Sequence, residues 1–272
     1  MKNITYLKQV YQKKIAKKFC NVDDISKCPN NGKCSCRIAA EIKAYIQSVI
    51  PDPYYKLSID DFTGRDSNQQ LLSNDIAYKA KENIIKYCWG NNMTLEKFKD
   101  ISHDKRDNIS VMDIRRKRCD NVVIFADSEV YGKPSSKKTG KTFIASLIMQ
   151  EAIKRRAFPG NHIQTYDWVP FSSLTNYIIS GDIEVISSKS CDWLVVDDIV
   201  GFKNTTSSDA FIASKVDPFF FERLRDNLPT IFVFRFDINK PVVSLESKFG
   251  VAIGKIANDK NTMIISLCEE IE

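Results

Sequence analysis

The stretch that most constrains the fold is a polar octapeptide near the middle of the chain. It reads Ser135-Ser136-Lys137-Lys138-Thr139-Gly140-Lys141-Thr142. It follows an apolar run at residues 122–126, and the apolar residues after it recur at helical spacing from Phe143 to Ala152. A strand, a polar loop and a helix in this order are the context of a phosphate-binding P-loop.

The chemistry of such a loop makes all eight residues candidates for binding ATP. Backbone N–H groups of the loop and of the helix N-terminus would point at the phosphates. The Lys141 ammonium would reach the β- and γ-phosphates, and the Thr142 hydroxyl would bind Mg²⁺. The usual pattern begins with glycine, but Ser135 stands there, and serine tolerates unusual backbone angles less well. A lysine-rich surface loop that contains Gly-Lys-Thr is the alternative interpretation.

A second motif lies at residues 191–199, where a short β-branched run ends in Asp197 and Asp198. A continuous apolar run is typical of a buried parallel strand, and acids at its carboxyl end would lie beside the P-loop. Asp197 would hold Mg²⁺ through water, and Asp198 would orient or activate the attacking water. The alternative is a strand followed by an acidic turn. The two motifs together, with room for one βα unit between them, predict a nucleotide site.

Length and composition fit one domain of ordinary size with a small appendage. The chain has 272 residues, of which 43% are hydrophobic, enough for a substantial core. It contains no run of 18 apolar residues, and its N-terminus lacks the apolar core of a signal peptide. We therefore expect a cytoplasmic protein that makes no membrane contact. In that compartment its eight cysteines suggest metal ligands or free thiols rather than disulfides.

The first part of the chain combines an amphipathic segment, residues 2–19, with a cluster of cysteines. The cluster consists of Cys20, Cys28, Cys34 and Cys36. Four soft ligands suit tetrahedral Zn²⁺, which would stabilise a small segment that lacks a core of its own. Free thiols, a smaller ligand set and an iron–sulfur cluster are the alternatives. We predict a zinc-stapled helical module at residues 1–47 that binds a partner protein.

The rest of the chain alternates between helical and strand patterns, which predicts an α/β fold with a mostly parallel sheet. Helices are expected at residues 37–50, 75–89, 170–180, 211–226 and 243–257. Strands are expected at 122–126, 162–168, 191–199, 228–234 and 262–267, with a polar loop at 202–210. The net charge is +6, and basic residues cluster in the first 18 residues and at 115–118. Such clusters attract nucleic-acid phosphates or are solvated faces, and the sequence leaves both interpretations open.

The segment before the P-loop carries a family resemblance. Ile50-Pro51 is followed by Tyr54, then by Asp61-Phe62, then by a helix and the P-loop strand. This arrangement resembles the AAA+ ATPases of the DnaC/DnaI helicase-loader and IstB group, from about Cys34 to the end of the chain. The resemblance implies a P-loop AAA+ three-layer sandwich at residues 48–272. Residues 91–120 exceed the usual link into the P-loop strand and would be an insertion.

The resemblance also implies roles for four basic residues. In AAA+ proteins the helix before the fourth core strand ends in an arginine finger that acts on a neighbouring subunit, so Arg223 or Arg225 is the candidate. A surface ion pair with Glu222 or Asp226 is the alternative for either arginine. Arg235 occupies the sensor 1 place, where asparagine is usual, and Lys255 is nearest to the sensor 2 place. Lys141, Asp198 and the two finger candidates form the predicted catalytic set.

The family's function implies an ATPase that forms a homo-oligomer on ATP binding and delivers a replicative helicase to single-stranded DNA. ATP, Mg²⁺ and Zn²⁺ are the expected cofactors. One rival is an IstB-like transposition ATPase that acts on duplex DNA with a transposase. The other is a non-hydrolysing, nucleotide-bound adaptor, which Ser135 and Arg235 favour because both depart from the family pattern.

Overall fold

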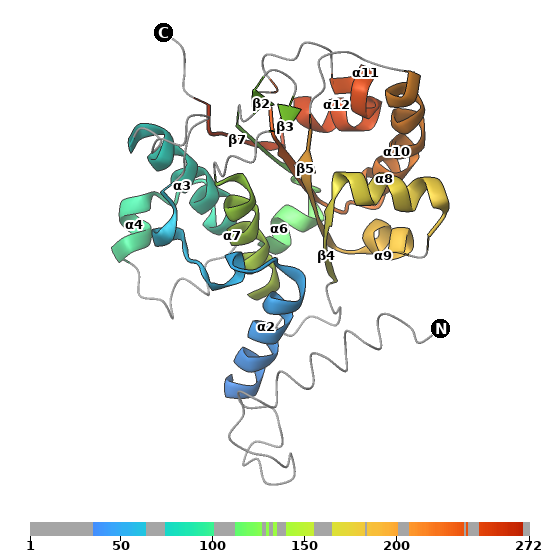
Figure 1. Ribbon diagram of the computed structural model, residues 1–272. Coiled ribbons are helices and arrows are strands. Elements are labelled where there is room, and N and C mark those ends of the chain that lie inside the picture. Colours follow the sequence, from blue (N-terminus) through green and yellow to red (C-terminus); the bar gives the residue numbers. More distant parts are fainter. Residues whose placement is uncertain are drawn as a thin grey trace, which may run out of the picture.

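The computed structural model describes residues 35–63, 74–100, 112–126, 129–130, 133–134, 140–154, 165–182, 184–200, 207–236, 238 and 245–268. Their core is a five-stranded sheet of order β4-β5-β6-β1-β7, in which every neighbouring pair is parallel (Figure 1). The strands are β1 (Val122–Phe125), β4 (Tyr166–Pro170), β5 (Trp193–Ile199), β6 (Thr230–Phe234) and β7 (Met263–Ser266). A separate antiparallel pair joins β2 (Glu129–Val130) to β3 (Lys133–Pro134). The predicted parallel α/β fold is confirmed.

The central strands are the most apolar parts of the chain. Every residue of β1 and of β6 is buried, as expected for strands that have helices on both faces. Side chains alternate across β1: Val122 and Ile124 enter one core cluster, and Val123 and Phe125 enter the other. The edge strand β7 is only partly buried.

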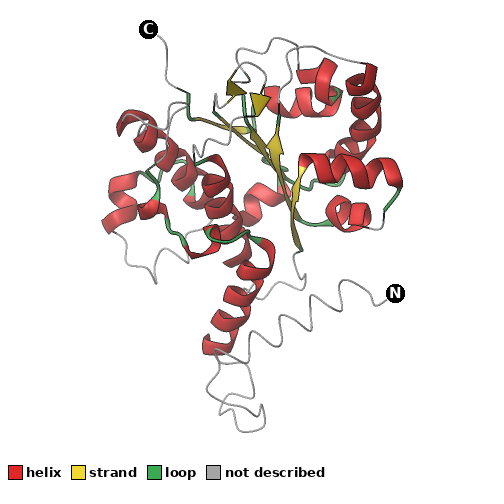
Figure 2. Cartoon of the chain, in the orientation of Figure 1, coloured by secondary structure: helices red, strands yellow, loops and turns green. Residues whose placement is uncertain are grey.

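Helices cover both faces of the sheet and complete the three layers (Figures 1 and 2). On one side lie α2 (Ser35–Val49), α3 (Asn74–Trp89), α4 (Leu95–Asp100) and α7 (Lys141–Lys154). On the other lie α8 (Phe171–Ser180), α9 (Glu184–Ser190), α10 (Ser207–Arg225), α11 (Leu245–Phe249) and α12 (Val251–Asn258). The short helix α6 (Met112–Lys117) precedes β1 and buries Met112 in the first core cluster. No helix within the described ranges has the length and apolar character needed to cross a membrane.

Helix α2 spans the predicted domain boundary at residue 47. It packs on α7 and β4, and the backbone N–H of Tyr166 donates to the Tyr45 hydroxyl at 3.3 Å. The rings of the same two tyrosines meet edge to face, with centroids 5.5 Å apart. The second half of α2 therefore belongs to the packed core. The module predicted at residues 1–47 falls mostly outside the described residues and stays a prediction.

The segment that follows α2 is held against α7. It forms two 3₁₀ turns, η2 (Tyr54–Lys56) and η3 (Ile59–Asp61). The Gln150 side-chain amide donates to the carbonyl oxygens of Tyr54 and Leu57, both at 3.2 Å. Phe143 at the start of α7 packs against the rings of Tyr54 and Phe62. These contacts attach the segment along most of α7.

Two local predictions are wrong. The helix expected at 243–257 is divided into α11 and α12 at Gly250, whose φ is +102°. The Asp217 carboxylate of α10 accepts the backbone N–H groups of Val251 and Ala252, at 3.1 and 2.8 Å, and so caps α12 from another helix. The polar loop expected at 202–210 also ends early, because α10 begins at Ser207.

The insertion predicted at 91–120 contributes two described helices. Phe98 of α4 packs edge to face on Trp89, with ring centroids 4.7 Å apart. Arg115 of α6 donates to the carbonyl oxygens of Lys86 and Tyr87, and to Asp120 at 2.9 Å. Arg115 is thus bound within the fold rather than presented as part of a basic surface.

Candidate functional site

The carboxyl ends of β1, β5 and β6 lie side by side at one edge of the sheet. Lys141 and Thr142 begin the helix that follows β1, Asp197 and Asp198 lie near the end of β5, and Arg235 directly follows β6. The Arg235 backbone N–H donates to the Ile199 carbonyl oxygen at 2.9 Å, which fixes the end of β6 against that of β5. Ligands of open α/β sheets bind at this edge.

The entry into α7 has P-loop character in its described part. Gly140 has a φ of +95°, a conformation that favours glycine, and its carbonyl oxygen accepts the Ile144 N–H at 3.0 Å. The remaining loop residues predicted to surround the phosphates lie outside the described residues. They are Ser135, Ser136, Lys137, Lys138 and Thr139.

Thr142 and Asp197 form an oxygen donor pair. The Thr142 hydroxyl donates to Asp197 Oδ1 at 3.5 Å. Burial raises the pKa of the Asp197 carboxyl, and the Asp198 charge adds to this, while hydrogen bonds from the Asp198 N–H and Thr142 and the charge of Lys141 oppose it. A carboxylate beside a hydroxyl suits Mg²⁺, which prefers oxygen ligands and keeps several waters. These residues therefore fit the predicted metal.

Lys141 is a buried cation at the same place. Only 7% of the residue is exposed. Burial first and the positive charge of Arg235 second lower the pKa of its ammonium to about 8, although the negative charges of Asp197 and Asp198 act in the opposite direction. An anionic ligand would stabilise the charged form of this lysine, so the site is electrostatically suited to a phosphate.

Asp198 and Arg235 form an ion pair across the ends of β5 and β6. Asp198 has a φ of +64°, and its backbone N–H donates to Asp197 Oδ1 at 2.7 Å. The paired register of β5 and β6 is irregular between Val196 and Ile199, which is where the two acids lie. The strand end thus turns Asp198 toward Arg235 rather than continuing a regular ladder.

Tyr54 is a neighbour of the site that the sequence marked only as part of a family pattern. Burial raises the pKa of its phenol, and the negative charge of Asp197 raises it further, so the two groups interact electrostatically. Its ring stacks on that of Phe143, one turn into α7. The spacing Ile-Pro-x-x-Tyr was the available signal, but it does not by itself reveal that the Tyr54 phenol lies near enough to Asp197 to interact with its charge.

The geometry contradicts Arg223 as an arginine finger. Its side chain is 1% exposed and is surrounded by backbone acceptors of its own subunit. It donates to the carbonyl oxygens of Ser188, Lys189, Cys191 and Pro229 and to the Thr230 hydroxyl. A guanidinium enclosed in this way cannot reach a phosphate on a neighbouring subunit, so its role is structural.

Arg225 and Lys255 lie on the side of the molecule formed by α10 and α12. The Arg225 side chain is 70% exposed and pairs with Asp226 at 2.9 Å. This surface ion pair is the alternative to an arginine finger that the sequence left open. The Lys255 ammonium lies 5.3 Å from the centroid of the Phe221 ring. Both remain predictions as nucleotide-contacting residues.

The predicted zinc ligands are not tested. Cys20, Cys28 and Cys34 lie outside the described residues, and the side chain of Cys36 is not described. The cysteines whose side chains are described form no disulfide, and they are Cys88, Cys119, Cys191 and Cys268. Within the described part of the chain, no group of three or more His, Cys, Asp or Glu side chains is placed to hold a metal.

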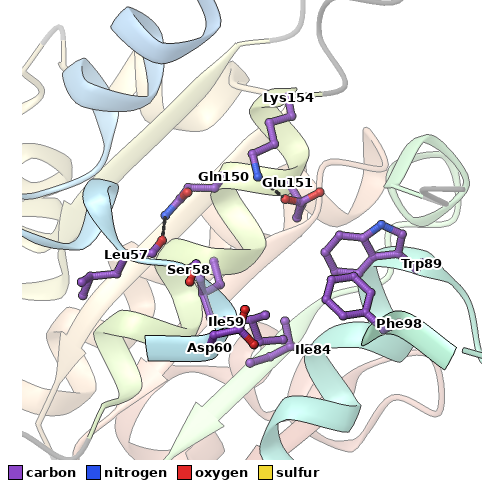
Figure 3. Close-up of a pocket in the computed structure, with 11 residues that line it drawn as sticks. Leu57, Ser58, Ile59, Asp60, Ile84, Trp89, Phe98, Gln150, Glu151 and Lys154 are labelled. Atoms are coloured by element: carbon purple, nitrogen blue, oxygen red, sulfur yellow. Dashed lines mark hydrogen bonds and ion pairs between the residues drawn. The ribbon is translucent and has the colours of Figure 1, made fainter. Parts of the chain in front are cut away.

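A hollow lies about three turns along α7 from Lys141 (Figure 3). It has a volume of about 240 Å³ and is lined by residues 57–60, by α7, and by Ile84, Trp89 and Phe98 of the α3–α4 side. Its polar groups include Glu151, which pairs with Lys154 at 2.5 Å. None of the predicted site residues lines it.

Comparison with known proteins gives structural neighbours only. No family model matches the sequence, and no curated protein matches it. The chain is similar to the crystal structure of DnaI, with 16% identity over 74% of this chain and 90% of that one, at a TM-score of 0.39. It is similar to the DnaC helicase loader, with 13% identity over 79% and 99% of the two chains, at a TM-score of 0.45. A DNA replication initiation factor matches at 16% identity over 66% of this chain and 49% of that one, with a TM-score of 0.37.

The neighbours thus include DnaI and DnaC, the group that the sequence resembles. All three TM-scores are below 0.5.

Proposed function

We propose that this protein is an AAA+ ATPase of the helicase-loader type. One observation carries the nucleotide site: a buried Lys141 lies with Thr142, Asp197 and Asp198 at the carboxyl edge of a parallel sheet. These are the groups that phosphoryl transfer requires, namely a cation for the phosphates, oxygen ligands for a metal and a carboxylate for the attacking water.

Each residue has a distinct task in this proposal. Lys141 binds the β- and γ-phosphates, and its desolvation strengthens that contact. Thr142 and Asp197 hold Mg²⁺, which neutralises charge on the phosphates when it is bound. Asp198 orients the attacking water and accepts its proton.

The loader part of the proposal is drawn from the sequence resemblance and agrees with the name of the DnaC helicase loader. Subunits would associate on ATP binding, with Arg225 as the remaining finger candidate, because it is exposed near the end of α10. The ring or spiral would hold single-stranded DNA, and residues 1–47, stapled by zinc, would hold a replicative helicase in the cytoplasm. An IstB-like ATPase that acts on duplex DNA is the close rival.

A second candidate function, a nucleotide-bound adaptor that does not hydrolyse ATP, is favoured by a specific contact. Asp198, the residue assigned to the attacking water, is engaged by Arg235. If that ion pair persisted with ATP bound, the site would bind nucleotide without turnover.

ATP hydrolysis by the purified protein distinguishes these functions. It is measured alone, with single-stranded DNA and with duplex DNA, beside Lys141→Ala and Asp198→Asn. If single-stranded DNA stimulates hydrolysis by the wild type and both variants lack that hydrolysis, the helicase-loader function is supported. Stimulation by duplex alone favours the transposition ATPase, and binding without turnover favours the adaptor. Hydrolysis that persists in Lys141→Ala contradicts the assigned site.

A further inference from the structure

The hollow shown in Figure 3 combines an apolar wall with a buried carboxylate. Its apolar lining consists of Leu57, Ile59, Ile84, Trp89, Phe98 and Leu147. Ile84, Trp89 and Phe98 also belong to the first core cluster, and the rings of Trp89 and Phe98 pack edge to face. Core packing therefore fixes this wall, and the hollow is a preformed feature of the fold.

Glu151 brings a negative charge to the lining. Its side chain is only 7% exposed, whereas that of Lys154, its partner at 2.5 Å, is 41% exposed. In Figure 3 the Glu151 carboxylate lies on the side of α7 that is nearer Trp89 and Phe98. Asp60, an exposed residue of η3, adds a second acid to the lining. Because the charged lining consists of two acids and one lysine, the hollow favours a cationic ligand.

The volume of the hollow narrows the class of ligand further. It is about 240 Å³, whereas pockets for drug-sized molecules have about 300–1,000 Å³. A group as large as one amino-acid side chain therefore fits better than a nucleotide. The two acids would also repel the phosphates of a nucleotide.

The lining favours a guanidinium over an ammonium. A guanidinium is more weakly hydrated, so it loses less on entering a largely apolar hollow. Its plane stacks on aromatic rings, and its forked N–H groups match a carboxylate. The hollow offers both kinds of partner, in the rings of Trp89 and Phe98 and in the carboxylate of Glu151. A carboxylate accepts several hydrogen bonds, so Glu151 can bind a guanidinium beside Lys154 or in its place.

We propose that this hollow receives an arginine side chain of a partner protein. The aliphatic part of the arginine would contact the apolar wall, and its guanidinium would bind Glu151 in competition with Lys154. A single side chain provides little affinity by itself, but arginines that enter pockets are common anchors of larger interfaces. The site lies about three turns along α7 from Lys141, and the proposal does not depend on the ATP site.

Binding of small analogues tests the choice of side chain. The isotope-labelled full chain, without nucleotide, is titrated with N-acetyl-argininamide, with its neutral isostere N-acetyl-citrullinamide and with N-acetyl-lysinamide. The NMR signal of the Trp89 indole N–H, assigned from its loss in Trp89→Phe, reports on the hollow. The arginine compound should shift this signal saturably. Its affinity should exceed that of the citrulline compound by at least about tenfold and that of the lysine compound several-fold.

Two variants test the assigned partners, with thermal unfolding to establish that each is folded. Glu151→Gln keeps the shape of the side chain without its charge and should weaken binding of the arginine compound by about tenfold. Lys154→Met removes the competing cation and should tighten that binding several-fold, but only while Glu151 is present. If Glu151→Gln does not fold, Lys154→Met decides the question by the same titration.

Four outcomes would overturn the proposal. The Trp89 signal does not shift saturably, the citrulline or lysine compound binds as tightly as the arginine compound, Glu151→Gln binds as the wild type does, or Lys154→Met gains no affinity. Agmatine, a free alkylguanidinium without a peptide backbone, is titrated in parallel. If agmatine binds more tightly than N-acetyl-argininamide, the ligand is a free small molecule rather than a side chain, which also contradicts the proposal.

Discussion

The hydroxyl of Thr142 lies 3.5 Å from Asp197 Oδ1, although the residues are 55 positions apart in the sequence. The first turn of α7 and the end of β5 bring them together beside the buried ammonium of Lys141. This pair of oxygens is the proposed position of the metal.

Loss of the Thr142 hydroxyl or of the Asp197 charge should make nucleotide binding insensitive to Mg²⁺. Thr142→Val keeps the shape of the side chain without its hydroxyl, and Asp197→Asn removes the charge. Each variant should bind ATPγS with similar affinity in Mg²⁺ and in EDTA, whereas the wild type binds more tightly with Mg²⁺. A Mg²⁺ dependence equal to that of the wild type in both variants would place the metal elsewhere.

Nucleotide binding should weaken as pH rises above about 8. The pKa of the Lys141 ammonium is lowered from 10.5 to about 8 by burial first and by Arg235 second. Below pH 8 the ammonium is already charged before phosphate binds, so affinity changes little. Above pH 8 the free site is largely neutral, and binding must take up a proton, which lowers the affinity.

Titration calorimetry near pH 9 in buffers of different ionisation enthalpy measures that proton uptake. Lys141→Arg is the matched control, because arginine stays charged throughout this range. It should bind nucleotide without proton uptake. If the wild type takes up no proton on binding, or if Lys141→Arg takes up as many protons as the wild type, Lys141 is not the group that titrates.

Two arginines two residues apart should behave in opposite ways. Arg223→Met removes the donor for five acceptors, four of them buried, and should lower the free energy of unfolding by about 3 kcal/mol. Arg225→Met should leave the urea midpoint unchanged, because its side chain is largely exposed. If Arg225 acts in trans, this variant should also lose ATPase activity while it still binds ATP. Equal stabilities of the two variants would contradict the buried role of Arg223.

The cap that Asp217 provides to α12 should stabilise the α10–α12 packing. Asp217→Ala removes the acceptor of the Val251 and Ala252 N–H groups and should cost about 1 kcal/mol, measured by urea unfolding. Asp217→Asn, which keeps an acceptor, is the control and should cost less. Gly250→Ala should also destabilise the protein, because its Cβ would come within 2.3 Å of Asp217 Oδ1. If both alanine variants have the same free energy of unfolding as the wild type, the contact between α10 and α12 does not stabilise the protein.

Much of the fold could be predicted because the strands are apolar runs. Val122–Phe125 and Thr230–Phe234 are buried throughout, and burial on both faces is what a continuous β-branched and aromatic run indicates. The break at Gly250 could not be predicted from spacing, since apolar residues recur on both sides of it. The break depends on Asp217, a residue of another helix that caps α12.

The candidate site, like the fold, could be predicted from the sequence only in part. Lys141, Thr142 and the two acids were recognisable because their motifs fix residue types at set distances from a strand end. The burial of Arg223 could not be predicted from the sequence. It depends on the carbonyl oxygens of Ser188 in α9 and of Pro229 before β6, which only the folded chain brings around the guanidinium. The Arg235–Asp198 ion pair depends on how the ends of β5 and β6 meet, which sequence spacing does not reveal.

The most direct test of the central claim, that ATP binds at Lys141, is an equilibrium titration with a fluorescent ATP analogue and Mg²⁺. The wild type and Lys141→Ala are compared, with thermal unfolding to establish that both are folded. We predict saturable binding by the wild type and an affinity at least about tenfold lower in Lys141→Ala. Equal affinity in the two proteins, or no binding by a folded wild type, would contradict the account.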